Sequence, residues 1–383
     1  MKICMVVPDF DRIGGYEKQA FSLSKDLKKR GKEVFILTNK KWKEQPALEV
    51  REGITIYRIS GFPNFLGGHY LGTLNAIILF FLHNQKKIQI VHAHALTHFA
   101  VLCIFVGKIL NKKGLIKIAT EEDISKIMSS SSIIQKLLIP FSKFTNYYVA
   151  ISENIKKEIL RMGVPSEKIY STPNGVDTNI YKPLNLKDKK AKKRFLSIPD
   201  GEIVIFVGRL AFRKGVDVLI KAWKKVIQRF PHACLLIVGS GEEEKKLINL
   251  SNSLNLIENI RFVGMVDNVV DYLQTSDVFS FPSRLEGSPN AILEALACGL
   301  PVIGTNIGGI VDVINDGENG LLIPPENSDL LASNICQLLQ DKEYRESFGV
   351  KARESALSLF SFDVVSKGYL ECYQQLTKFS SRV

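Results

Sequence analysis

Short apolar runs alternate with amphipathic segments from one end of the chain to the other. In the first half these runs occupy residues 3–7, 34–38, 54–59, 90–94, 115–120 and 147–151. In the second half they occupy residues 204–208, 234–238, 260–263, 278–282, 302–305 and 320–323. Between many of them lie segments with helical spacing, for example residues 17–29, 152–161, 216–230 and 291–297. Nearly all-apolar runs are typical of parallel strands covered on both faces. The pattern predicts an α/β fold with two Rossmann-like parallel sheets.

Two sheets imply two domains, which a chain of 383 residues accommodates. Turn-forming residues at 171–177 place the boundary so that an N-terminal domain covers residues 1–172 and a C-terminal domain covers 173–359. The stretch 182–193 contains six lysines and no long apolar run, so we expect a solvated connector there. Residues 360–383 have an apolar stripe of their own, which predicts a helix that packs back on the first domain.

The formal net charge of +12 is concentrated in the first half of the chain. Residues 1–172 carry 26 Lys and Arg against 14 Asp and Glu, whereas residues 173–383 carry 25 of each kind. The imbalance indicates contact with an anionic surface, unless the lysines serve only solubility. We favour membrane lipid over nucleic acid, because the basic residues are spread over many elements and no nucleic-acid-binding motif is present.

We expect any contact with the membrane to be peripheral. No signal peptide is apparent, and the longest apolar stretches, 77–82 and 99–106, fall far short of the ~20 residues that span a bilayer. Segment 133–144 combines bulky apolar residues with two lysines, which suits either an anionic bilayer or a core helix. The expected location is the cytoplasm, at the inner face of the membrane.

The cysteine and histidine positions argue against a metal site. The six cysteines are widely spaced, mostly within apolar runs and without a CxxC pair, so we expect buried, reduced thiols. His92 and His94 end a predicted strand and project from one face, but no further ligands are spaced for zinc. A polar contact in a cleft and a structural role are both compatible with this pair.

Glu286 and Glu294 are the most informative pair of residues in the chain. A loop-like Gly-Ser-Pro-Asn separates Glu286 from a helix-like run that contains Glu294. Glu286 therefore projects from a loop at the start of a helix, where free backbone N–H groups and a partial positive charge are present. This arrangement suits a ligand with hydroxyl groups and a diphosphate, because carboxylates accept from hydroxyls and the helix start accepts phosphate.

Two loops that follow predicted strands add groups suited to phosphate. Arg209 and Lys214, five residues apart beside glycines, are placed to clamp a diphosphate, although solvated side chains would show the same pattern. Gly14 and Gly15 would let a phosphate approach the backbone at a helix start, or would belong to an ordinary flexible loop. We expect the side chains of Lys214 and Glu286 to lie in a solvated cleft.

A third loop contains Gly239 and Gly241. This GxG turn follows a predicted strand but lacks the third glycine of the dinucleotide fingerprint. A tight turn and a nucleotide contact are both open for it. The incomplete fingerprint also disfavours a dehydrogenase.

These motifs occur together in one known family. The chain resembles the retaining family-4 glycosyltransferases of the GT-B fold, in which two Rossmann-like domains face a central cleft. The resemblance covers essentially the whole chain and is densest in the second half. It is carried by Arg209 with Lys214, Glu286 with Glu294, and the segments 150–153, 174–177 and 299–309.

The resemblance implies a nucleotide-diphosphate sugar, UDP- or GDP-linked, bound as a substrate mainly by the second domain, with no metal and no cofactor. Arg209 and Lys214 would hold the diphosphate. Glu286 would bind hydroxyls of the donor sugar, and Glu294 would bind the nucleotide ribose. Fixed cations and helix-end dipoles aimed at the leaving diphosphate would lower the reaction barrier.

The other positions that the resemblance assigns to donor binding are backbone or small polar ones. They are Ser288 and Asn290 beside sugar and phosphate, Gly239, Gly241 and Met265 around base and phosphates, and Gly14 and Gly15 from the opposite domain.

One position departs from the family pattern. The family commonly has a Thr-x-His segment after the fifth strand, whereas this chain has Glu122 at the expected His position. A carboxylate there would orient an acceptor hydroxyl or stabilise a cationic sugar, or it would only belong to an acidic helix start. Glu122 therefore joins the candidate catalytic residues.

The combined interpretation is a retaining hexosyltransferase that moves a sugar from a nucleotide-diphosphate sugar to a hydroxyl of an acceptor. We expect a lipid-linked glycan or polysaccharide precursor as that acceptor. The alternatives are a nucleotide-sugar epimerase of the same fold and a non-catalytic sugar-binding relative. Both are disfavoured by the intact set of Arg209, Lys214, Glu286 and Glu294.

Overall fold

The computed structural model describes residues 1–10, 14–60, 69–118 and 138–378. The chain divides into two compact units, of which the second is the continuous segment Gly175–Ser361. The first unit combines Met1–Asn174 with Phe362–Val383, so the end of the chain belongs with its beginning.

Within the described residues, the first unit contains an eight-stranded sheet in the order β3-β4-β2-β1-β5-β6-β7-β8. Neighbouring strands are parallel except for β3, which runs antiparallel to β4 at one edge. The strands are β1 (Lys2–Val6), β2 (Glu33–Asn39), β3 (Leu48–Arg51), β4 (Ile54–Ile59), β5 (Ile90–Ala93), β6 (Lys113–Ile118), β7 (Tyr147–Ala150) and β8 (Ile169–Ser171). The inner strands are buried on both faces, as their apolar runs predicted.

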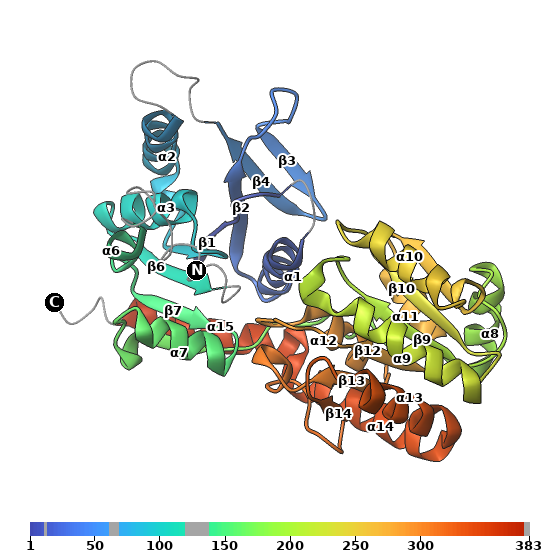
Figure 1. Ribbon diagram of the computed structural model, residues 1–383. Helices are drawn as coiled ribbons and strands as arrows, with labels where there is room; N and C mark the ends of the chain where they lie inside the picture. Colours follow the sequence, from blue (N-terminus) through green and yellow to red (C-terminus); the bar gives the residue numbers. More distant parts are fainter. Residues whose placement is uncertain (11–13, 61–68, 119–137, 379–383) are drawn as a thin grey trace. The chain divides into compact units, whose positions relative to one another are not determined.

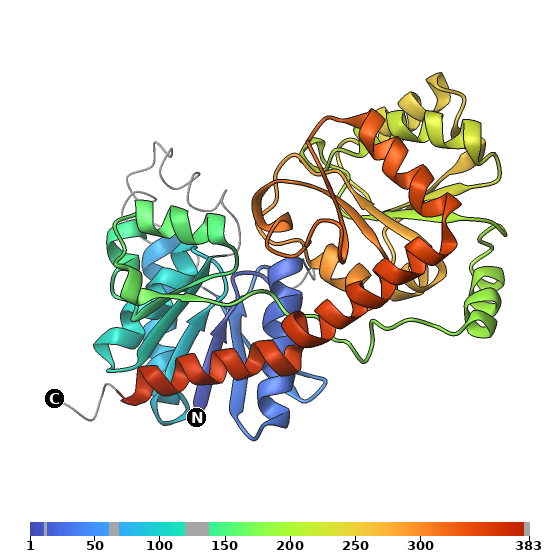
Figure 2. The same ribbon diagram turned by 90° about the horizontal axis from the view of Figure 1, so that it is seen from below.

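Helices cover both faces of this sheet. Helix α15 lies beside α1 on one face, as Figure 2 shows for the red and blue helices, and α2 lies beside α3 on the other (Figure 1). Their apolar sides complete two separate hydrophobic clusters, one for each face. Among the described residues of this unit, the α-helices are α1 (Gly15–Lys29), α2 (His69–Asn84), α3 (His98–Ile109), α6 (Leu138–Ser142), α7 (Glu153–Arg161) and α15 (Phe362–Lys378).

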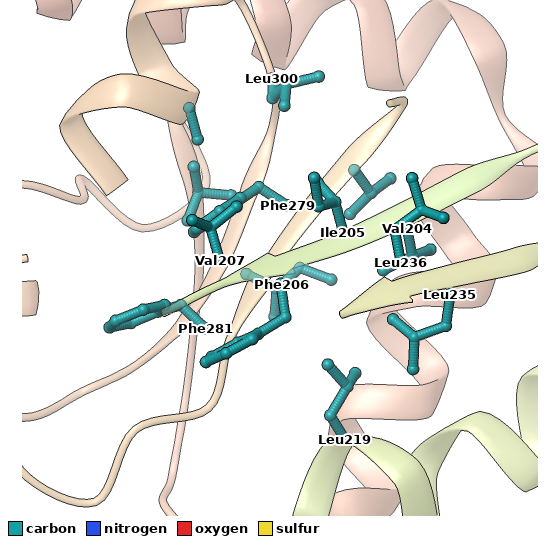
Figure 3. Packing of buried hydrophobic residues seen from close by; sticks show 14 of the residues in the cluster. Val204, Ile205, Phe206, Val207, Leu219, Leu235, Leu236, Phe279, Phe281 and Leu300 are labelled. Carbon is teal, nitrogen blue, oxygen red and sulfur yellow. The ribbon is translucent and has the colours of Figure 1, made fainter. Parts of the chain in front are cut away.

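The second unit contains a fully parallel six-stranded sheet in the order β11-β10-β9-β12-β13-β14. The rings of Phe206 and Phe281 stack at 5.7 Å in its core, where they join the aliphatic side chains of neighbouring strands (Figure 3). The strands are β9 (Ile203–Val207), β10 (Cys234–Val238), β11 (Ile260–Gly264), β12 (Val278–Phe281), β13 (Val302–Thr305) and β14 (Gly320–Ile323).

Every α-helix of the second unit except one contributes buried side chains to the hydrophobic core of this unit. The α-helices are α8 (Leu186–Phe195), α9 (Val216–Arg229), α10 (Glu244–Ser253), α11 (Val269–Thr275), α12 (Asn290–Ala297), α13 (Ser328–Gln340) and α14 (Lys342–Ser355). The exception is α8, which overlaps the segment for which the sequence predicted a solvated connector. Most of its residues are exposed, as expected, but they form a helix that the sequence did not predict. Lys189 pairs with Asp277 at 2.7 Å, and Lys192 pairs with Asp271. Ion pairs therefore attach this lysine-rich helix where an apolar stripe is lacking.

Candidate active site

The strand order of the second sheet reverses between β9 and β12. Strands β10 and β11 lie on one side of β9, whereas β12, β13 and β14 follow on the other. In open parallel sheets, ligands bind outside the carboxyl ends of the strands at such a reversal. Here β9 leads into the short 3₁₀ turn Phe212–Lys214, and β12 leads into the loop that carries Glu286.

Lys214 and Glu286 form a buried ion pair at this edge of the sheet. The Lys214 ammonium donates a hydrogen bond to Glu286 Oε2, and each residue is only 8% exposed. The same ammonium lies 4.8 Å from the centre of the Phe281 ring, which belongs to the core shown in Figure 3. The expectation that both side chains lie in a solvated cleft was therefore wrong. Because the pair is buried, removing one partner would leave an uncompensated charge.

Glycines let three loops around this ion pair, those after β9, β12 and β13, approach so closely that no room is left for side chains. Gly215 has a φ of 66°, and a Cβ there would lie 1.9 Å from the carbonyl oxygen of Pro282. Gly309 donates its N–H to the Glu286 carbonyl oxygen at 3.0 Å. A Cβ on Gly309 would lie 1.9 Å from the carbonyl oxygen of Gly287. Contact between main chains thus fixes the backbone that presents the ion pair.

Helix α12 begins directly after the loop that carries Glu286. Its N-cap residue is Pro289, whose side chain cannot accept a hydrogen bond from the N–H groups of the first turn. Glu294 lies one turn further along the helix and is buried, whereas Ser288 and Asn290 are half-buried. The four polar residues expected around the donor therefore lie on one loop and the helix that follows it.

Arg209 is not joined to this ion pair. Its side chain is 70% exposed, and its Nε donates to Glu242 Oε2 at 3.0 Å. A hydrogen bond from its own backbone and the neighbouring Arg209 lower the pKa of Glu242. An exposed pair of this kind contributes little to stability, so Arg209 can exchange its partner for a ligand at small cost.

The glycines after β10 pack against the loop that follows β9. A Cβ on Gly239, which has a φ of 134°, would lie 1.9 Å from the carbonyl oxygen of Gly208. A Cβ on Gly241 would lie 2.3 Å from that of Leu210. Close packing of the two loops therefore explains why glycine is required at both positions. Of the two roles left open by the sequence, this supports the tight turn. Met265, at the end of β11, is 85% exposed, and a nucleotide contact at these positions stays a prediction.

In the first unit, Gly14 makes room for a carboxylate. Gly14 is the N-cap of α1, and a Cβ there would lie 2.5 Å from Glu17 Oε2. Burial raises the pKa of Glu17 to about 7, although hydrogen bonds from its own backbone N–H, Tyr16 and Gly14 oppose the shift. The expected phosphate contact at Gly14 and Gly15 stays a prediction, and it would have to share this helix start with Glu17.

The two histidines that end β5 lie inside the first unit. His92 and His94 are fully buried with ring centroids 4.2 Å apart, and His92 Nδ1 lies 2.7 Å from the Tyr373 hydroxyl of α15. Burial lowers the pKa of both imidazoles, so they are neutral. Of the two roles left open by the sequence, the structure supports the structural one.

A buried lysine beside these histidines has no signal in the sequence. Lys117 on β6 is buried, and burial lowers its pKa to about 7. Its ammonium donates to Asn174 Oδ1 at 2.7 Å. Since Lys117 and Asn174 are far apart in the chain, only the folded sheet brings them together.

Two predicted features lie wholly or partly outside the described residues. Glu122 is one of them, so its proposed role is an expectation from the sequence alone. Of segment 133–144, the structure describes only the part from residue 138 onward.

All six cysteines are free and buried, as predicted. No group of three or more His, Cys, Asp or Glu suited to a metal ion occurs within the described residues. Among these residues, too, no helix is both long and apolar enough to span a membrane.

Comparison with known proteins gives consistent matches along the chain. Residues 188–355 match the family described as Glycosyl transferases group 1, and residues 13–180 match that described as Glycosyltransferase Family 4. The N-acetyl-alpha-D-glucosaminyl L-malate synthase of Bacillus anthracis is 26% identical, over 99% of this chain and 98% of that protein. A component of the phosphatidylinositol N-acetylglucosaminyltransferase of Arabidopsis thaliana is 25% identical, over 84% of this chain and 70% of that protein.

Among solved structures, HepE of Anabaena in complex with UDP has a TM-score of 0.82. It is 20% identical and covers 98% of this chain and 100% of that one. The fold and the site at the strand reversal define a glycosyltransferase of the GT-B type. Within that class, the chain belongs to the family-4 glycosyltransferases, as its motifs suggested. The epimerase and the non-catalytic alternatives are set aside accordingly.

Proposed function

We propose that this enzyme transfers a sugar from a nucleotide-diphosphate sugar to a hydroxyl of a lipid-linked glycan or polysaccharide precursor, with retention of configuration. The observation that carries the proposal is the buried pair of Lys214 and Glu286 at the strand reversal. A cation and a carboxylate held together at this position match a donor that combines a diphosphate with sugar hydroxyls.

The residues of the second unit would divide the work between the two halves of the donor. Lys214 and the exposed Arg209 would neutralise the diphosphate as it leaves with the electron pair of the broken anomeric bond. Glu286 would accept hydrogen bonds from sugar hydroxyls while Lys214 stays paired with its Oε2. Glu294 would hold the ribose, and the uncapped start of α12 would stabilise negative charge.

A uridine nucleotide is the first donor to test. Structures of HepE, which has the same fold, contain UDP and UDP-glucose. The match to a GDP-mannose-dependent mannosyltransferase of Corynebacterium glutamicum, 33% identical over 51% of this chain, keeps GDP in the comparison.

The first unit supplies the argument for a lipid-linked acceptor and a peripheral contact with anionic lipid. Phe105 of α3 packs edge-on against Phe141 and Phe144 at 5.3 and 5.2 Å, and Phe144 is exposed beside Lys143. Aromatic and basic groups together suit the interface of an anionic bilayer. The relative from Arabidopsis thaliana is named for transfer to phosphatidylinositol.

Calorimetric titration tests the donor half of the proposal without knowledge of the acceptor. Purified protein is titrated with UDP-glucose, UDP-N-acetylglucosamine and GDP-mannose, and with UDP and GDP alone. We expect saturable heat for one nucleotide class and none for the other. Protein that gives no heat with any of them would disprove the proposed donor.

Flotation with vesicles tests the membrane half. The protein should float with vesicles that contain phosphatidylglycerol and stay behind with pure phosphatidylcholine. Equal behaviour with both compositions would exclude anionic lipid as the partner.

A further inference from the structure

Arg284, two residues before Glu286, has every donor of its guanidinium engaged. Nη1 and Nη2 donate to the two carboxylate oxygens of Asp217 at 2.8 and 2.9 Å. Nη2 also donates to Glu326 at 3.1 Å, and Nε donates to the other oxygen of that carboxylate. The fifth N–H donates to the carbonyl oxygen of Phe212 at 2.6 Å. A guanidinium has five N–H groups, so none is left for a ligand.

These contacts join the stretch 212–217 to Glu326 around one half-buried side chain, which is 14% exposed. Phe212 opens the turn that carries Lys214, Asp217 lies in the first turn of α9, and Glu326 precedes α13. The guanidinium carbon also lies 4.1 Å from the centre of the Phe212 ring. Arg284 therefore contacts both the backbone and the aromatic ring of Phe212 in this turn.

The backbone of the same loop completes the attachment. The Arg284 N–H donates to the carbonyl oxygen of Arg213 at 2.7 Å, and the Ser283 hydroxyl donates to the same oxygen at 3.0 Å. Arg213 directly precedes Lys214 in the chain. The position of the lysine is thus set from the loop that also carries Glu286.

Arg284 is paired with two carboxylates, and Lys221 also pairs with one of them, Asp217, at 3.6 Å. Hydrogen bonds with Asp217, and then with Glu326, raise the pKa of Arg284. Burial opposes the ionisation of Asp217, but hydrogen bonds from Arg284 outweigh it and lower the pKa of that carboxyl. The two carboxylates occupy the guanidinium, so Arg284 does not compete with Lys214 for an anionic ligand.

We propose that Arg284 is a positioning residue, which holds Lys214 where its ammonium meets Glu286 and, on the proposed function, the diphosphate of the donor. Arg284 acts through Lys214 and does not touch the ligand itself. The planar guanidinium is required, because a lysine in its place has three donors on a point charge and cannot bind both carboxylates and the Phe212 carbonyl in this arrangement.

Variants of the cluster test this role against Lys225→Ala as a control. Lys225 forms an exposed pair with Asp329 on the same two helices, α9 and α13. We expect Arg284→Lys to lower the turnover of donor by roughly 10–100-fold, the range that follows a small displacement of a binding group. Glu326→Gln, which perturbs only one arm of the cluster, should give a smaller loss, and the control none. Arg284→Lys and Glu326→Gln are milder than Arg284→Ala, and they keep the test valid if Arg284→Ala does not fold.

The affinity for UDP and GDP in the Lys214→Ala background separates positioning from general destabilisation. If Arg284 acts through Lys214, adding Arg284→Lys to Lys214→Ala should change the affinity by less than about twofold. If the two substitutions reduce the nucleotide affinity by factors that multiply in the double variant, the inference about Arg284 is wrong. The same holds if the Arg284→Lys enzyme has wild-type affinity and turnover. Neither result would affect the proposed function. Wild-type protein that binds neither nucleotide would overturn the proposed function, and with it the role of Arg284.

Discussion

Lys117 donates a hydrogen bond from its ammonium to Asn174 Oδ1 over 2.7 Å, inside the first unit. Burial depresses the pKa of Lys117 from 10.5 to about 7, so the unfolded chain binds more protons than the folded one between these values. The free energy of unfolding should therefore increase as the pH rises from 7 toward 10.5, by up to about 1.4 kcal/mol per pH unit.

Urea unfolding across this pH range checks the prediction with two lysine variants. Lys117→Met should remove the increase, whereas Lys108→Met, at an exposed position of α3, should keep it. An unchanged pH profile in Lys117→Met would show that another group is responsible.

The buried pair of Lys214 and Glu286 predicts a large difference between single and double substitutions. Lys214→Met or Glu286→Leu alone leaves an uncompensated charge and should cost about 3–5 kcal/mol in the free energy of unfolding. The double variant should recover most of this loss and still lack activity. Denaturant unfolding and donor turnover measure the two effects separately.

The exposed pair of Lys225 and Asp329 provides the matched control for that experiment. Its removal should change the free energy of unfolding by less than about 1 kcal/mol and leave turnover unaffected. A double variant at Lys214 and Glu286 with wild-type turnover would contradict the site assignment.

We expect an added methyl group to be tolerated at Gly368 in helix α15 but not at Gly309. Gly309→Ala must displace the carbonyl of Gly287, which lies 1.9 Å from the added methyl group, and so should reduce both stability and donor affinity. Gly368→Ala in α15 meets atoms no closer than 3.7 Å and should stabilise the protein by about 0.5–1 kcal/mol. Thermal unfolding with and without UDP compares the two, and equal effects would rule out the steric explanation.

For Glu17 we expect a pH dependence of the free energy of unfolding that is opposite in sign to that of Lys117. Its folded pKa of about 7 lies above the ordinary 4.5, so the folded state binds more protons between these values. The free energy of unfolding contributed by this group should therefore fall as the pH rises from 4.5 to 7. Glu17→Gln should flatten this part of the profile, as measured by urea unfolding. A variant that keeps the full decline would show that Glu17 is ionised in the folded protein.

The sequence predicted the inner strands well, because burial on both faces leaves an uninterrupted apolar run. Among them, β10 and β13 have the predicted bounds. The sequence also predicted the bounds of β4, whose residues alternate between buried and half-buried, and of the edge strand β14. It missed β3, an edge strand whose residues alternate between exposed and half-buried positions and include two charges. It also missed α8, which is attached by Lys189 and Lys192 to partners about eighty residues away. Neither feature leaves a local apolar pattern.

The sequence named candidate residues for the site but not the connections between them. Lys214 and Glu286 were recognised from loop positions and glycines, but their burial depends on a contact between segments 72 residues apart. Arg284 gave no signal at all, because its partners lie in two segments that are 42 or more residues away in the chain. Local motifs show which groups are present, whereas pairing depends on how the sheet brings the loops together.

The placement of α15 has a practical consequence for dissecting this enzyme. The helix comes last in the chain yet supplies Tyr373 to His92 and the flank of α1, so the first unit is discontinuous in the gene. A fragment that stops at residue 174 would expose the apolar face that α15 covers. The second unit, by contrast, is one uninterrupted stretch, and it is the half that could be produced separately for titration with nucleotides.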